Sequence, residues 1–207
     1  ACFLNKLSIK NYGKKLSNIV VMGMGEPLDN YENTHDALKL IMSKKGMEMS
    51  HRRITLSTVG LSNEIKKLAD SGLNVNLSVS LHAANNKLRS SIMPINRKYN
   101  LDSLAKSLQY FHKITGKRIS YEYILLKGIN DSKENARELA EFTKITPCKI
   151  NLIEYNPFKG VSYNKTGEEE TIDFMKILEK RNLIVKLRRS RGKDIDAACG
   201  QLANKMH

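Results

Sequence analysis

The sequence predicts an α/β protein built on a parallel sheet, arranged as a barrel or as part of one. Short apolar runs alternate with amphipathic helical segments along most of the chain, which is the pattern of parallel strands joined by crossover helices. The glycine-rich phosphate loop of dinucleotide-binding folds does not follow the first apolar run. Polar residues instead recur where several predicted strands end, and this favours a barrel over a doubly wound sheet.

Six segments have the short apolar or alternating pattern of strands. The first stops at Gly25-Glu26-Pro27 and has the continuous apolar character of a strand buried on both faces. The predicted strands cover residues 18–24, 53–58, 75–81, 119–126, 149–155 and 183–187.

The segments between these strands carry apolar residues on one helical face and charged residues on the other. One helix is predicted after Asn33, and a last one starts near Asp196. Gly72 and Gly116 occupy positions where glycine commonly ends a helix. The other predicted helices cover residues 63–69, 86–92, 101–114, 134–144 and 171–181. No linker or low-complexity tract interrupts the alternation, so we expect a single domain over residues 1–207.

The formal net charge is +14, from 35 Lys and Arg against 21 Asp and Glu. Such an excess favours a polyanionic partner, and RNA or DNA fits better than a membrane. The alternative is that the lysines only keep the protein soluble. The sequence shows no signal peptide and no apolar stretch long enough to span a bilayer, and its three widely spaced cysteines cannot build a disulfide framework. We therefore predict a cytoplasmic location without membrane association.

Seven residues lie at or just past the ends of four predicted strands. Because the carboxyl ends of parallel strands surround one mouth of a barrel, we expect these residues to form one ligand site. A glycine there lets the backbone approach a ligand, and a carboxylate suits an ammonium group. Taken singly, each has a structural alternative, such as a turn residue, a strand-end cap, a packed histidine or an Asx turn. The residues are Gly25, Glu26, Ser57, Ser80, Leu81, His82 and Asn156.

A second candidate site is the segment 190–204, which contains Cys199 between Ala198 and Gly200 and follows a basic run. Small neighbours leave the sulfur sterically open, and nearby cations favour the reactive thiolate. Inert packing in the core is the alternative. Cys148 precedes a predicted strand and is expected to be a small buried hydrophobe, whereas Cys2 has no partner at metal-ligand spacing.

Six motifs, taken together, resemble the adenine-C2 methyltransferases of 23S ribosomal RNA and tRNA, which are radical S-adenosylmethionine enzymes. The resemblance implies a partial (β/α)6 barrel of the TIM type, with its first strand missing from this chain and S-adenosylmethionine in its mouth. Gly25 and Glu26 would hold the amino group of the cofactor, and the other five residues of the mouth would contact the rest of it. The motifs are residues 23–28 (GMGEPL), 52–58 (RRITLST), 80–83 (SLHA), 93–96 (MPIN), 151–157 (NLIEYNP) and 194–202 (DIDAACGQL).

The same resemblance implies that Cys199 is a methyl carrier. One S-adenosylmethionine methylates Cys199, and a second is cleaved reductively at a 4Fe-4S cluster, so two cofactor molecules are used per product. The resulting 5′-deoxyadenosyl radical takes a hydrogen from the S-methyl group, and the methylene radical adds to adenine C2. A second cysteine then frees the product by forming a disulfide with the carrier. Adenine C2 is not a nucleophile, which explains why a radical route is required.

The chain departs from this family at the cluster. The family's CxxxCxxC motif is absent, and Cys2, Cys148 and Cys199 are too far apart in sequence to supply its three or four thiolates. We therefore expect the chain alone to be inactive. The parent protein would carry the cluster motif, the second cysteine and an amino-terminal RNA-binding domain, and it would act on 23S rRNA and tRNA as a monomer with an electron donor such as flavodoxin.

Three alternative functions are left open. One is an adenine-C8 methyltransferase that confers antibiotic resistance, although Pro27 and residues 189–192 favour the C2 type. The second is a barrel enzyme that uses S-adenosylmethionine on a small molecule. The third is a non-catalytic RNA-binding module, in which Cys199 would be incidental.

Overall fold

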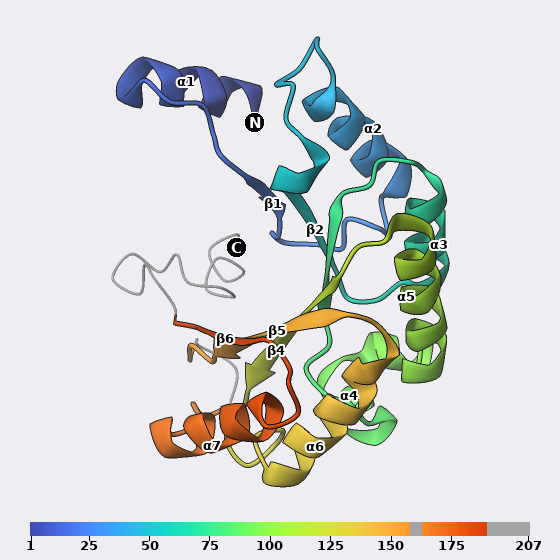
Figure 1. The fold of residues 1–207 in the computed structure, drawn as a ribbon, viewed down its shortest axis with the longest axis vertical. Helices are drawn as coiled ribbons and strands as arrows, with labels where there is room; N and C mark the ends of the chain where they lie inside the picture. Colours follow the sequence, from blue (N-terminus) through green and yellow to red (C-terminus); the bar gives the residue numbers. More distant parts are fainter. Residues whose placement is uncertain (158–162, 190–207) are drawn as a thin grey trace, which may run out of the picture.

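The computed structural model describes residues 1–157 and 163–189. Its strands form one six-stranded sheet in which the spatial order follows the chain and every neighbouring pair is parallel (Figure 1). Parallel strands without a reversal of order form the wall of a barrel, whereas a doubly wound sheet reverses its order. The strands are β1 (Ile19–Val21), β2 (Ile54–Thr58), β3 (Asn76–Ser80), β4 (Ile119–Leu125), β5 (Cys148–Glu154) and β6 (Val185–Arg188).

Helices separate consecutive strands, and Figure 1 shows α2, α3, α5 and α6 along one side of the sheet. The helices are α1 (Cys2–Tyr12), α2 (Tyr31–Met42), α3 (Ser62–Asp70), α4 (Asn86–Ile92), α5 (Leu101–Thr115), α6 (Lys133–Phe142) and α7 (Glu168–Glu179). Short 3-10 helices cover His51–Arg53, Pro94–Arg97 and Thr143–Ile145. Within the described ranges, no helix combines the length and the apolar character needed to cross a bilayer.

Local sequence signals set several helix ends. Gly116 ends α5 in the left-handed conformation, with a φ of 66°. Ser132 begins α6 with a reciprocal capping box, in which its hydroxyl accepts the N–H of Asn135 and the Asn135 side chain accepts the N–H of Ser132. In contrast, α1 buries none of its residues against the rest of the described chain.

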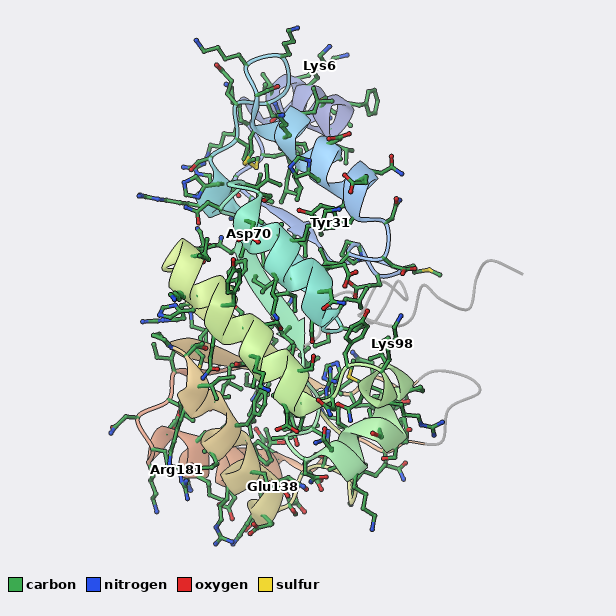
Figure 2. The ribbon with its side chains drawn as sticks, turned by 90° about the vertical axis from the view of Figure 1, so that its right-hand side faces the viewer. Lys6, Tyr31, Asp70, Lys98, Glu138 and Arg181 are labelled. Carbon is green, nitrogen blue, oxygen red and sulfur yellow. The ribbon has the colours of Figure 1, made fainter. Side chains whose placement is uncertain are left out.

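Figure 2 views the helical layer from the outer side of the sheet. Side-chain hydrogen bonds hold this layer together. The hydroxyl of Tyr110 on α5 donates to Asp70 Oδ1 at the end of α3, at 2.8 Å. Asn85, which caps α4, donates to Glu138 Oε2 on α6 at 2.7 Å. These bonds hold helices that follow the loops at the carboxyl edge of the sheet.

The apolar core lies between the sheet and these helices. On β4, Tyr121 and Tyr123 are fully buried and pack against Phe142 and Phe174, with ring centroids 6.0 and 5.5 Å apart. Full burial of an apolar side chain of this size stabilises the fold by about 1.5–3 kcal/mol. Because side chains alternate along a strand, Glu122 between these tyrosines faces the other, inner side of the sheet. The inner side of the barrel wall is therefore polar where the outer side is apolar.

Candidate functional site

The loop after β1 carries Gly25 and Glu26. Gly25 has a φ of 86°, and a Cβ added there would meet nothing within 4 Å, so its backbone is open to a ligand. Oε2 of Glu26 accepts the N–H of Val59 at 2.7 Å, and Oε1 accepts the N–H of Leu28 at 3.0 Å. Two backbone amides thus orient a partly exposed carboxylate, whose other lone pairs can still accept from an ammonium group.

The predicted serines lie on the inner face of the sheet near the ends of β2 and β3. Ser57 is opposite Ser78 in the strand register, and Ser80 is opposite Glu122. Ser78 donates to Glu122 Oε1 at 2.8 Å, which places its side chain on the inner face, and Ser80 two residues later shares that face. Ser57 and Ser80 are both partly exposed, so their hydroxyls lie where a ligand in the barrel can reach them.

Leu81 is the predicted site residue whose side chain lies away from the mouth. It is fully buried in the apolar core. Its backbone N–H donates to the carbonyl of Glu122 at 3.0 Å, which ties the end of β3 to β4. Only the backbone of Leu81 is therefore suited to a role in the site.

His82 is held in an uncommon conformation by its neighbours. Its φ is 57°, in the left-handed region that costs about 1–3 kcal/mol for a residue with a side chain. The N–H of Ile124 donates to His82 Nδ1 at 3.1 Å, and Asn130 Nδ2 donates to the His82 carbonyl at 2.8 Å. Burial, together with the charge of Arg89, lowers the pKa of His82 to about 4. The ring is therefore neutral near pH 7, with Nδ1 as an acceptor and its proton on Nε2.

Asn156 completes the predicted mouth. It follows β5 and is 6% exposed. Since all six strands are parallel, the segments after β1, β2, β3 and β5 lie at the same edge of the sheet. Direct hydrogen bonds join the first two segments through Glu26 and Val59, and join the third to β4 through His82.

Glu122 is a residue of this region that the sequence analysis did not single out. It is 4% exposed, and it accepts from Ser78 and Asn151 on Oε1, both at 2.8 Å, and from Arg188 on Oε2 at 3.1 Å. This single carboxylate joins β3, β4, β5 and β6 across the inner face. The available signal was an acid inside an otherwise apolar strand, because a buried carboxylate requires partners on neighbouring strands.

The cysteines lie apart from this edge. Cys148 is buried, as predicted, and burial raises the pKa of its thiol, which makes it a poor nucleophile. It lines an open pocket of about 470 Å³ with Arg118 and Thr146 at the amino ends of β4–β6, opposite the predicted mouth. Cys2 is exposed on α1. Cys199 and the segment 190–204 lie outside the described residues.

The donors of this edge fit S-adenosylmethionine but not an iron-sulfur cluster. Across residues 1–157 and 163–189, no three His, Cys, Asp or Glu side chains gather closely enough to hold a metal ion. Neither Cys2 nor Cys148 has the neighbouring thiolates that a 4Fe-4S cluster requires. In contrast, S-adenosylmethionine has amino, ribose and base groups that suit the polar groups found here. These are a carboxylate, two serine hydroxyls, a neutral imidazole and the open backbone of a glycine.

Curated relatives align with nearly all of this chain. It is 47% identical over 203 residues to "Probable dual-specificity RNA methyltransferase RlmN" of Salinibacter ruber, and 50% identical over 194 residues to the protein of the same name from Christiangramia forsetii. These alignments cover 97% and 94% of this chain and 55% of each relative. The chain therefore spans about half the length of the relatives that it matches.

Solved structures support the barrel. A radical SAM methyltransferase from Sphaerobacter thermophilus superposes with a TM-score of 0.91 at 42% identity, covering 94% of this chain and 57% of that one. A domain of pyruvate-formate lyase-activating enzyme from Bacteroides vulgatus has a TM-score of 0.63 at 16% identity, covers 84% of this chain and 99% of that one, and supports the fold alone. The predicted fold class is thus confirmed. The Radical SAM superfamily model matches residues 6–140, more than half of the sequence, and the chain belongs to that superfamily.

Proposed function

We propose that the protein containing this chain is a radical SAM methyltransferase that methylates C2 of adenosine in 23S rRNA and tRNA. The observation that carries the proposal is the identity of 47–50% to relatives named as dual-specificity RNA methyltransferases, extending over at least 94% of this chain. The choice of C2 rests on the motif resemblance, and in particular on Pro27 and residues 189–192.

The carboxyl edge of the sheet would bind S-adenosylmethionine. Glu26 would accept from the amino group of its methionine part beside the open backbone of Gly25. His82 would donate from Nε2, and Ser57, Ser80, Asn156 and the backbone of Leu81 would complete the contacts. When bound with a 4Fe-4S cluster and a reductant such as flavodoxin, the cofactor supplies radical chemistry for an adenine carbon that polar methyl transfer does not reach.

Cys199 would be the methyl carrier. Its thiolate would take a methyl group from the sulfonium of one cofactor molecule, forming a C–S bond and releasing S-adenosylhomocysteine. A second cofactor molecule would be consumed per product, and a disulfide between Cys199 and another cysteine would release the methylated base. The basic run that precedes Cys199 would favour the thiolate.

RNA as the substrate agrees with the charge of the chain. A net charge of +14 favours a polyanion, and every phosphate that is neutralised releases counterions. RNA binding should therefore weaken steeply as salt increases. An enzyme acting on a small neutral molecule would not show this dependence.

The test uses the intact protein, reconstituted anaerobically with iron, sulfide, S-adenosylmethionine and a reductant, and given 23S rRNA and tRNA. Digested RNA analysed by mass spectrometry should contain 2-methyladenosine, whereas 8-methyladenosine would refute the C2 assignment. Cys199→Ala should abolish methylation with little change in RNA binding, and Cys148→Ala is the matched control that should retain activity. Methylation by Cys199→Ala would refute the carrier role. The chain of residues 1–207 alone should hold no cluster and release no 5′-deoxyadenosine.

A further inference from the structure

Arg89 on α4 is a fully buried guanidinium directly behind the carboxyl edge of the sheet. It is 0% exposed. Five oxygens accept hydrogen bonds from it, three of them at 2.7–3.1 Å and two at 3.4 Å. The acceptors are the carbonyls of Val59, Ser80, Leu81 and Tyr99, and Oδ1 of Asn96.

None of these acceptors carries a charge. Burial lowers the pKa of Arg89 to about 10, so the side chain stays protonated at neutral pH. No ion pair within the described ranges includes Arg89. Burying an unpaired cation is unfavourable, and its five hydrogen bonds compensate only in part. A contribution to packing alone does not account for a charge at this position.

The carbonyls that Arg89 holds belong to the candidate site. The N–H of Val59 donates to Glu26, and the carbonyl of the same residue accepts from Arg89 Nη2 at 2.7 Å. Directly after β3, the carbonyl of Leu81 accepts from Arg89 Nε at 3.1 Å, and the next residue is His82. One guanidinium therefore fixes the backbone that orients Glu26 and the backbone that carries the strained His82.

We propose that Arg89 is the positioning residue of the cofactor site, because its guanidinium locks the loops after β2 and β3 so that Glu26 and His82 face the same ligand. A planar fork with five N–H donors can bind carbonyls of two strands at once, whereas a lysine ammonium acts as a single point. The identity of the ligand, S-adenosylmethionine, rests on the proposed function. The effect of Arg89 on His82 does not depend on it.

The experiment compares Arg89→Lys with Arg97→Lys in the full-length protein. Lysine keeps the charge, and Arg97 is an exposed residue of the nearby Pro94–Arg97 helix. Calorimetric titration with S-adenosylmethionine should give a Kd about tenfold higher or more for Arg89→Lys, and within about twofold of wild type for Arg97→Lys. Nitrogen-detected NMR should show His82 as a single neutral tautomer in the wild type and in Arg97→Lys, but as a mixture in Arg89→Lys.

A purely structural role would lower the melting temperature of Arg89→Lys and leave both the Kd and the His82 tautomer unchanged, which would overturn the proposal. If Arg89→Lys does not fold, Asn96→Ala replaces it, because that variant removes the side-chain oxygen that orients the guanidinium toward the carbonyls of Val59 and Leu81. A Kd within about twofold of wild type for Asn96→Ala, with the His82 tautomer unchanged, would then overturn the proposal. If the wild type binds no S-adenosylmethionine, the proposed function fails, and the His82 tautomer alone decides the role of Arg89.

Discussion

Replacing Gly60 with alanine should destabilise the barrel more than any other replacement of a described glycine in the left-handed region. Gly60 lies between β2 and α3 with a φ of 106°, and an added Cβ would be 3.0 Å from Leu104 Cδ1 and 3.5 Å from Arg89 Nη2. The backbone conformation alone costs a residue with a side chain about 1–3 kcal/mol. Pressing a methyl group against Leu104, which is 0% exposed, adds about 1–3 kcal/mol.

The expected loss in the free energy of unfolding for Gly60→Ala is therefore about 2–6 kcal/mol. Gly116→Ala is the matched control, because Gly116 also has a positive φ, of 66°, but an added Cβ there meets nothing within 4 Å. That variant should lose only about 1–2 kcal/mol, from the backbone alone. Urea unfolding of the intact protein, followed by circular dichroism, measures both. Equal losses for the two variants would refute the argument that Leu104 and Arg89 crowd this position.

Two further predictions concern single side chains. The pKa of His82 is lowered to about 4 in the folded protein, so the unfolded chain takes up the proton first as the pH falls. The contribution of His82 to stability is therefore full above the unfolded pKa of about 6.5 and is lost as the pH drops toward 4. Between about pH 7 and pH 4.5, the free energy of unfolding measured by urea titration should fall by on the order of 2 kcal/mol more for wild type than for His82→Asn. Equal falls for the two proteins would contradict this. Glu122→Gln keeps an acceptor for Ser78 and Asn151 but loses the charge facing Arg188, whose side chain is 53% exposed, so we expect a loss of about 1–2 kcal/mol. Glu168→Gln is the control, because it breaks the exposed pair with Arg189 and should leave the urea midpoint of wild type unchanged. If Glu122→Gln also keeps the wild-type midpoint, the network around Glu122 contributes no stability.

The strands could be predicted from the sequence because each has its own alternation of apolar residues. β1 is the strand whose length was overestimated, since it covers Ile19–Val21 and not residues 18–24. Met22 and Met24 are apolar but 37% and 63% exposed, so hydrophobicity there does not report burial. α1 shows the same effect, because Phe3 is 74% exposed.

The mouth of the barrel was predicted from a rule of topology, namely that the ends of parallel strands meet. This rule predicted, without knowledge of any contact, that Glu26, Ser57 and His82 lie at one edge of the sheet. It could not find Glu122, whose importance depends on the register that brings Ser78, Asn151 and Arg188 to it. Register is a property of pairing between strands and is not written in any one of them.

Arg89 was missed for a related reason. In the short helix Asn86–Ile92, an arginine next to Ser90 and Ser91 has the pattern of a solvated residue, and an arginine is almost never fully buried. Its burial follows from the turn of the chain after Ser80, which brings α4 back behind the carbonyl of Val59, just after β2, and the carbonyl of Ser80 at the end of β3. Only the three-dimensional arrangement supplies those acceptors.

Several unfavourable features lie near the carboxyl edge of the sheet. Among the charged side chains of residues 1–157 and 163–189, Arg89 and Glu122 alone are buried. Arg89 donates to the carbonyl of Leu81 just after β3, and Glu122 accepts from Ser78 on β3. His82, with its left-handed backbone, follows the same strand, and Gly60 in a conformation restricted to glycine follows the adjacent one. Apolar replacements for buried charges are often neutral or stabilising, so a sequence under selection for stability alone would not gather them here. Their presence near one edge supports the proposal that this edge binds a ligand.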